Sequence, residues 1–131
     1  MAKISLIPKF NPLDEGFYKF KIIEVTHDEI KNKITVELMT EGGDTHREIF
    51  SFEKKDGGKN DGALWAFSNF VQCAMNDENI REIDTDELIG KYIQGNVAHQ
   101  QVGDKTYAKL KDREVCVNFK EPNIDLNDLL G

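Results

Sequence analysis

The sequence of 131 residues is poor in the residues that build disulfide frameworks and metal sites. Its two cysteines, Cys73 and Cys116, lie far apart and lack the CxxC spacing of zinc or redox sites. The three histidines, His27, His46 and His99, are equally scattered, so no Cys/His cluster predicts a metal site. We expect both thiols to be reduced and buried, behaving as small apolar groups.

Long apolar runs are also absent. No stretch approaches the roughly 20 residues that a membrane-spanning helix needs. The first ten residues, MAKISLIPKF, have too short an apolar segment for a secretory signal and no small-residue cleavage pattern. These two absences predict a cytoplasmic protein.

Catalytic signatures are missing as well. The chain contains no GxSxG, HExxH, P-loop or GxGxxG motif. Carboxylate pairs such as Asp84 and Asp86 have the chemistry to hold a metal. Solvated surface acids are far commoner than metal sites without a signature, so we interpret this pair as part of an acidic loop. We expect no enzymatic activity and no cofactor. A small hydrolase that uses this region is the weakest of the functional hypotheses.

The negative charge is confined to two segments. Residues 76–88 carry six acids and one base, and residues 120–131 carry three acids and one base. Together these two segments account for the formal net charge of -7, so the remainder of the chain is neutral overall. A local basic surface for nucleic acid is therefore compatible with the acidic total.

Alternating apolar and polar residues predict three strands in the first half of the chain, at 16–26, 33–40 and 45–53. Both faces of the first strand become apolar near Ile23, which indicates a β-bulge. A helix is predicted over 63–75, with Asp61 as its N-cap. Its apolar stripe, with Trp65 at the edge, is expected to enter the core. That stripe consists of Leu64, Phe67, Phe70, Val71 and Ala74.

The helix is followed by an acidic connection at 76–85, and residues 86–90 then predict a single helical turn that Gly90 closes. A two-stranded ribbon follows, with strands at 91–101 and 106–112 around a turn at 102–105. Residues 113–119 either form a sixth strand or prolong the fifth.

The order of three strands, one helix and two further strands predicts an all-β domain with one helix, folded as a five-stranded OB barrel. An open antiparallel sheet with the helix on one face is the alternative. We place the domain at 1–119, with a possible extra C-terminal strand, and a flexible acidic tail at 120–131.

A cationic, aromatic surface is predicted where the first and fifth strands lie close together. The outward residues of these strands are lysines and rings, which suit phosphates and stacked bases. The candidate nucleic-acid contacts on these strands are Phe17, Lys19, Lys21, Lys105, Tyr107, Lys109 and Lys111. A glycine-rich basic loop and two weaker candidates add Lys54, Lys55, Lys59, Arg47 and Tyr92. The alternative interpretation is that the lysines only protect strand edges and that Phe17 and Tyr107 are half-buried.

The chain terminates in EPNIDLNDLLG, which interleaves acids with apolar residues. One interpretation is a frayed end or a short helix that docks on its own domain. The other is a peptide that partner proteins bind. The candidate partner-binding residues are Asp125, Leu126, Asp128, Leu129 and Leu130.

Five short stretches resemble a family of phage and prophage single-stranded DNA-binding proteins, small OB-fold domains formerly of unknown function. They are GFY at 16–18, EIF at 48–50, LWAF at 64–67, DELIGK at 86–91 and KTYAKL at 105–110. The tail is similar to the acidic tip of bacterial single-stranded DNA-binding proteins, but it ends in Leu-Leu-Gly and lacks their Pro-Phe terminus.

The residues and the resemblance together imply a non-enzymatic, sequence-independent single-stranded DNA-binding protein. It would act in DNA replication or recombination in the cytoplasm of a bacterial host, with the tail binding replication or recombination proteins. Coating a strand favours a homodimer or higher oligomer, for which the apolar residues of 113–119 offer a pairing edge. The alternative function is an OB-like adaptor that binds a replication or recombination protein through its acidic surface.

Overall fold

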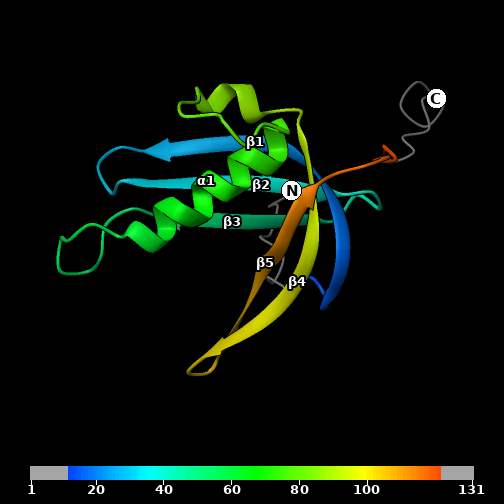
Figure 1. Ribbon diagram of the computed structural model, residues 1–131. Helices are drawn as coiled ribbons and strands as arrows, with labels where there is room; N and C mark the ends of the chain where they lie inside the picture. Colours follow the sequence, from blue (N-terminus) through cyan, green and yellow to red (C-terminus); the bar gives the residue numbers. More distant parts are fainter. Residues whose placement is uncertain (1–11, 122–131) are drawn as a thin grey trace, which may run out of the picture.

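A computed structural model describes residues 12–121 of the chain (Figure 1). It contains one five-stranded antiparallel sheet in the order β3-β2-β1-β4-β5, with a single α-helix against its inner face. The elements are β1 (Gly16–Asp28), β2 (Lys33–Thr40), β3 (Thr45–Ser51), α1 (Asp61–Met75), the 3-10 helix η1 (Thr85–Leu88), β4 (Tyr92–Val102) and β5 (Lys105–Val115). The predicted content of five strands and one helix is confirmed.

Strand β1 lies at the centre of the sheet and bends where the sequence predicted a bulge. Its register with β2 shifts between Ile22 and Glu24, because one extra residue of β1 stands opposite the partner strand. At this point the Ile22 amide donates to the carbonyl of Lys91, and the Gly90 amide donates to the carbonyl of Ile22. The predicted turn that ends at Gly90, whose φ is +88°, therefore connects the bulge to the start of β4.

A second bulge lies near the end of β5. Gln94 pairs with Glu114 and Asn96 pairs with Lys111, so two residues of β5, Asp112 and Arg113, stand opposite one residue of β4. Gly95 lies at this point, and a Cβ there would approach the Lys111 carbonyl oxygen to 2.6 Å. Only glycine fits this close approach of two backbones. The extra residue lets Arg113 point toward the helix, where its Nε donates to Asn69 Oδ1 at 3.0 Å.

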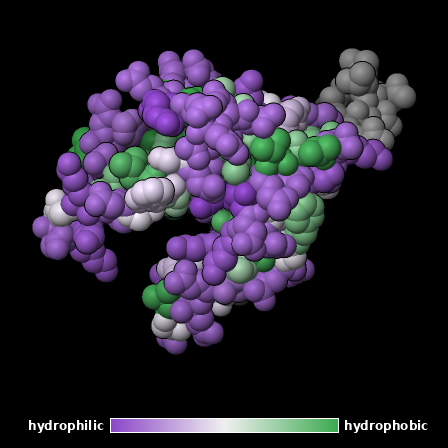
Figure 2. All heavy atoms as spheres, in the orientation of Figure 1, coloured by the Kyte–Doolittle hydropathy of each residue, from purple (hydrophilic) through white to green (hydrophobic). Residues whose placement is uncertain are grey.

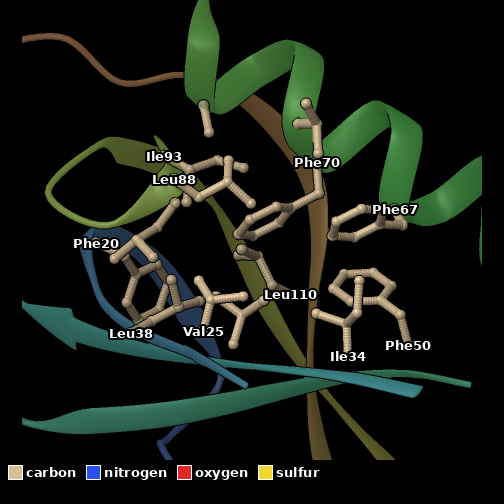
Figure 3. Close-up of a cluster of buried hydrophobic side chains, with 14 of the residues drawn as sticks. Phe20, Val25, Ile34, Leu38, Phe50, Phe67, Phe70, Leu88, Ile93 and Leu110 are labelled. Carbon is tan, nitrogen blue, oxygen red and sulfur yellow. The ribbon is translucent and has the colours of Figure 1, made fainter. Parts of the chain in front are cut away.

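The core lies between the inner face of the sheet and α1 (Figure 3). Phe20, Ile22, Leu38 and Ile93 of the strands are fully buried, as is Leu88 of η1. The helix contributes rings that pack on β3. The Phe67 ring lies 5.2 Å from the Phe50 ring in an edge-to-face arrangement, and the Phe70 ring lies 5.6 Å from it.

Two details of the predicted helix are wrong. Its N-cap is Asn60, whose side-chain oxygen accepts a hydrogen bond from the Ala63 amide, and Asp61 is already the first helical residue. Leu64 and Trp65 are not core residues, because their exposed fractions are 54% and 78%. The sheet covers only the part of the apolar stripe formed by Phe67, Phe70, Val71 and Ala74.

The backbone ladder is open between the edge strands β3 and β5, and side chains connect them instead. The buried Glu48 carboxylate of β3 accepts a hydrogen bond from the Leu110 amide of β5. His46 Nε2 lies 2.9 Å from the same carboxylate oxygen. Beside this pair, the Arg113 guanidinium lies 5.9 Å from the centre of the Phe50 ring. We call these contacts of Glu48, His46, Leu110, Phe50 and Arg113 the seam.

β5 continues to Val115, so residues 113–115 prolong the fifth strand, and the structure assigns no sixth strand within 12–121. The tail residues from 122 onward, and the contacts predicted for them, lie outside the described part. Cys73 and Cys116 are free and only half-buried, and burial raises the pKa of both thiols. No helix in the described part is long and apolar enough to cross a membrane.

Candidate nucleic-acid interface

The predicted lysines and rings of β1 and β5 lie on one face of the sheet, the face turned away from α1. Directly paired residues of antiparallel strands share a face. Phe17 pairs with Asn96, which pairs with Lys111, so these three residues form one row across the sheet. In neighbouring rows Lys19 pairs with Gln94 and Lys21 pairs with Tyr92. Strand β4 therefore separates β1 from β5 on this face.

The same face continues along the β4–β5 hairpin to its tip. Lys109 pairs with Ala98, Tyr107 with Gln100 and Lys105 with Val102. Since strands rise about 3.4 Å per residue, Lys105 to Lys111 spans about 20 Å along β5. We call the set of Phe17, Lys19, Lys21, Tyr92, Lys105, Tyr107, Lys109 and Lys111 the lysine face.

The two predicted stacking rings are accessible on this face. Phe17 is 54% exposed and Tyr107 is 44% exposed. Neither ring belongs to the buried cluster, so both have a free surface on which a base could stack. Within residues 12–121, Lys19, Lys105, Lys109 and Lys111 take part in no ion pair. Their ammonium groups are available to an anion.

Two acidic side chains on the lysine face accept hydrogen bonds from side-chain amides of β4. Glu114 accepts a hydrogen bond from Gln94 Nε2 at 3.1 Å, and Asp112 accepts one from Asn96 Nδ2 at 3.3 Å. These two amides of β4 are contacts that sequence reasoning did not assign to the site. Alternation places them on the same face of β4 as Tyr92, but an amide in a strand carries no signal of its own.

The segment 116–121 crosses one end of the lysine face, and we call it the strap. Its Glu121 carboxylate lies 3.2 Å from Lys21 Nζ and accepts a hydrogen bond of 2.7 Å from the Tyr92 hydroxyl. Its Phe119 ring lies 5.0 Å from the Tyr92 ring. The hydrogen bond to Glu121 raises the pKa of Tyr92, and the same bond together with Lys21 lowers the pKa of Glu121.

Other predicted contacts lie apart from the lysine face. Arg47 is on the outer face of β3 and forms an ion pair with Glu37 at 2.8 Å. The loop with Lys54, Lys55 and Lys59 follows β3 and closes on itself through a bridge between Glu53 and Lys59. Figure 2 shows a hollow between this loop and the projecting end of the β4–β5 hairpin. The structure therefore does not bring the loop lysines onto the lysine face.

The helix side of the molecule carries a different surface. A groove of about 480 Å³ lies between α1 and the acidic connection. Its lining includes the exposed Leu64 and Trp65 of the helix, and Ile80 and Arg81 of the connection. In the described part of the chain, no group of three His, Cys, Asp or Glu side chains has the geometry to hold a metal ion.

No family model matches this sequence, and no curated protein matches it either.

Proposed function

We propose that the protein is a non-enzymatic, sequence-independent single-stranded DNA-binding protein. The observation that carries this proposal is the lysine face: five lysines and three rings on one face of the sheet in a protein with a net charge of -7. An acidic protein that binds an anionic partner is expected to gather its positive charges on the binding face. The resemblance to phage and prophage DNA-binding proteins supports the same function.

The chemistry of the lysine face suits a single strand better than a duplex. Tyr107 and Phe17 offer exposed rings, and the bases of a single strand have free faces for stacking, whereas the bases of a duplex are already stacked on their neighbours. The lysines neutralise phosphates without reading a base sequence.

We also propose that the five-stranded sheet forms an OB barrel. Its support is the seam, where Glu48 binds the Leu110 amide and brings the two edge strands together through side chains. The order of strands and the position of α1 after β3 agree with that architecture. We also propose that the protein acts in phage or prophage replication or recombination. It would assemble into dimers, and its tail would bind partner proteins.

A titration with a fluorescent oligo-dT at low and moderate salt tests this function. Binding should weaken steeply with salt, because each phosphate contact contributes about 0.7 to the slope of log K against log salt. Tyr107→Ala removes a stacking surface worth about 1–3 kcal/mol, so the Kd should rise about 5- to 150-fold. Lys109→Glu should weaken binding and reduce the salt slope.

Arg81→Glu is the matched control for Lys109→Glu. It makes the same change of charge, but on the helix side of the molecule. Since distant charges are screened, its effect on the Kd should stay within about twofold. Equal losses from Arg81→Glu and Lys109→Glu would show a response to net charge alone. Absence of oligonucleotide binding at low salt would overturn the proposed function.

An adaptor that binds another protein is the second candidate function. The observation in its favour is the groove beside α1, where Trp65 is 78% exposed next to the acidic connection. An exposed tryptophan in an apolar groove is a common anchor of protein interfaces. Under this alternative Trp65→Ala would abolish partner binding, whereas oligonucleotides would not bind at any salt concentration.

A further inference from the structure

The strap makes three kinds of contact with the end of the lysine face formed by β1 and β4. The Val117 amide donates to Gln94 Oε1 at 3.3 Å, and the Phe119 ring lies against the Tyr92 ring. Glu121 then joins Lys21 and Tyr92, as described above. A further bond, from the Lys120 amide to Glu41 Oε2 at 2.7 Å, holds the strap over the turn after β2.

These contacts present the two chemical parts of a nucleotide. A carboxylate lies where a phosphate would pair with Lys21, at 3.2 and 3.3 Å from its Nζ. A flat ring lies where a base would stack, with ring centres 5.0 Å apart and planes at 36°. The Lys21 ammonium also lies 5.9 Å from the centre of the Tyr92 ring, so cation and stacking surface form one unit.

We infer that Lys21 and Tyr92 form a nucleotide subsite for one phosphate and one base, and that the strap occupies it as an intramolecular competitor. This inference rests on the proposed function and adds to it a division of the lysine face. Phe17, Tyr107 and the lysines of β5 form an open end. The Lys21–Tyr92 end becomes available only when the strap leaves.

The contacts that hold the strap on the lysine face can be displaced. Its contacts with the lysine face are made to side chains, and in residues 12–121 it joins no strand ladder. Glu121 keeps 51% of its side-chain surface exposed and Lys21 keeps 30%. A strand bound at the open end would bring its own phosphates to Lys21 at a high effective concentration. While the strap is closed the subsite is covered, so the apparent Kd equals the intrinsic Kd divided by the fraction of molecules whose strap is open.

Substitutions in the strap separate this competition from simple charge effects. Phe119→Ala removes the ring without a change of charge, and Glu121→Gln weakens the pairing with Lys21. Both should raise the affinity for oligo-dT at least threefold, and a Lys21→Ala change in either background should cancel the gain. Asp112→Asn is the matched control, since it removes one carboxylate from the same face, and Asp112 accepts from Asn96 rather than from Gln94, which binds the strap. Its effect should be smaller than that of Glu121→Gln.

Oligonucleotide length supplies a second readout. OB domains bind about 4–16 nucleotides. An oligo-dT of about 4 residues should therefore occupy only the open end of the lysine face, whereas one of about 12 residues should reach both ends. The gain from Phe119→Ala should be confined to the longer oligonucleotide. If wild type binds oligo-dT and Phe119→Ala leaves its affinity unchanged or lower, the subsite is wrong while the proposed function stands. If neither wild type nor the strap variants bind, the proposed function itself fails. A circular dichroism melt confirms that each variant is folded.

Discussion

Replacing Glu48 with alanine tests whether side chains hold the two edge strands together. The Glu48 carboxylate is 7% exposed and binds both the Leu110 amide and His46. Without it, a buried amide loses its acceptor, and a buried amide left unpaired costs about 1–3 kcal/mol. The hydrogen bond with His46 is lost as well, which leaves a second buried group unpaired at a similar cost, so the total is about 2–6 kcal/mol.

A loss of about 2–6 kcal/mol should lower the melting temperature of a domain of this size by about 6–30 °C. Urea unfolding followed by circular dichroism measures the free energy of unfolding directly. Glu48→Gln keeps one acceptor for the Leu110 amide, so it should cost less than the alanine variant. Hydrogen exchange at the Leu110 amide should accelerate in the alanine variant, because its acceptor is gone.

Glu37→Ala is the control for this experiment. Glu37 lies on β2 and pairs with Arg47 on the outer face, where its side chain is 39% exposed. Exposed ion pairs contribute about 0.2–1 kcal/mol, so this variant should lose no more than that. If Glu48→Ala and Glu37→Ala have the same free energy of unfolding, the seam contributes nothing and the reasoning is wrong.

Two further predictions concern the backbone and pH. Gly95→Ala should destabilise the domain in a urea melt, because its Cβ would approach the Lys111 carbonyl oxygen to 2.6 Å; an unchanged melt would contradict the observed bulge. The phenolate absorbance of Tyr92 should appear above its ordinary pKa of 10.0, and Glu121→Gln should return it toward that value. The hydrogen bond therefore stabilises the closed strap fully below pH 10.0 and is lost as pH rises through the raised pKa of Tyr92. Because the pKa of Glu121 is lowered, its contribution is present above 4.5 and is lost as pH falls through the lowered value.

The sequence by itself determined which side chains share a face of each strand. Alternation is a local property of an extended backbone, so the lysines of β5 and the Phe17–Lys21 side of β1 could be assigned before any pairing was known. The turn ending at Gly90 and the buried rings Phe67 and Phe70 follow from equally local patterns. These parts of the fold and of the candidate site were predictable for that reason.

Only the tertiary structure decided what covers each face. Lys21 meets Glu121 across 100 positions of sequence, and Leu110 meets Glu48 across 62. No local pattern carries such contacts, because they depend on how the sheet twists and where the chain leaves β5. The exposure of Trp65 was missed for the same reason: a helical stripe shows which residues can enter a core, whereas the width of the opposing sheet decides which of them do.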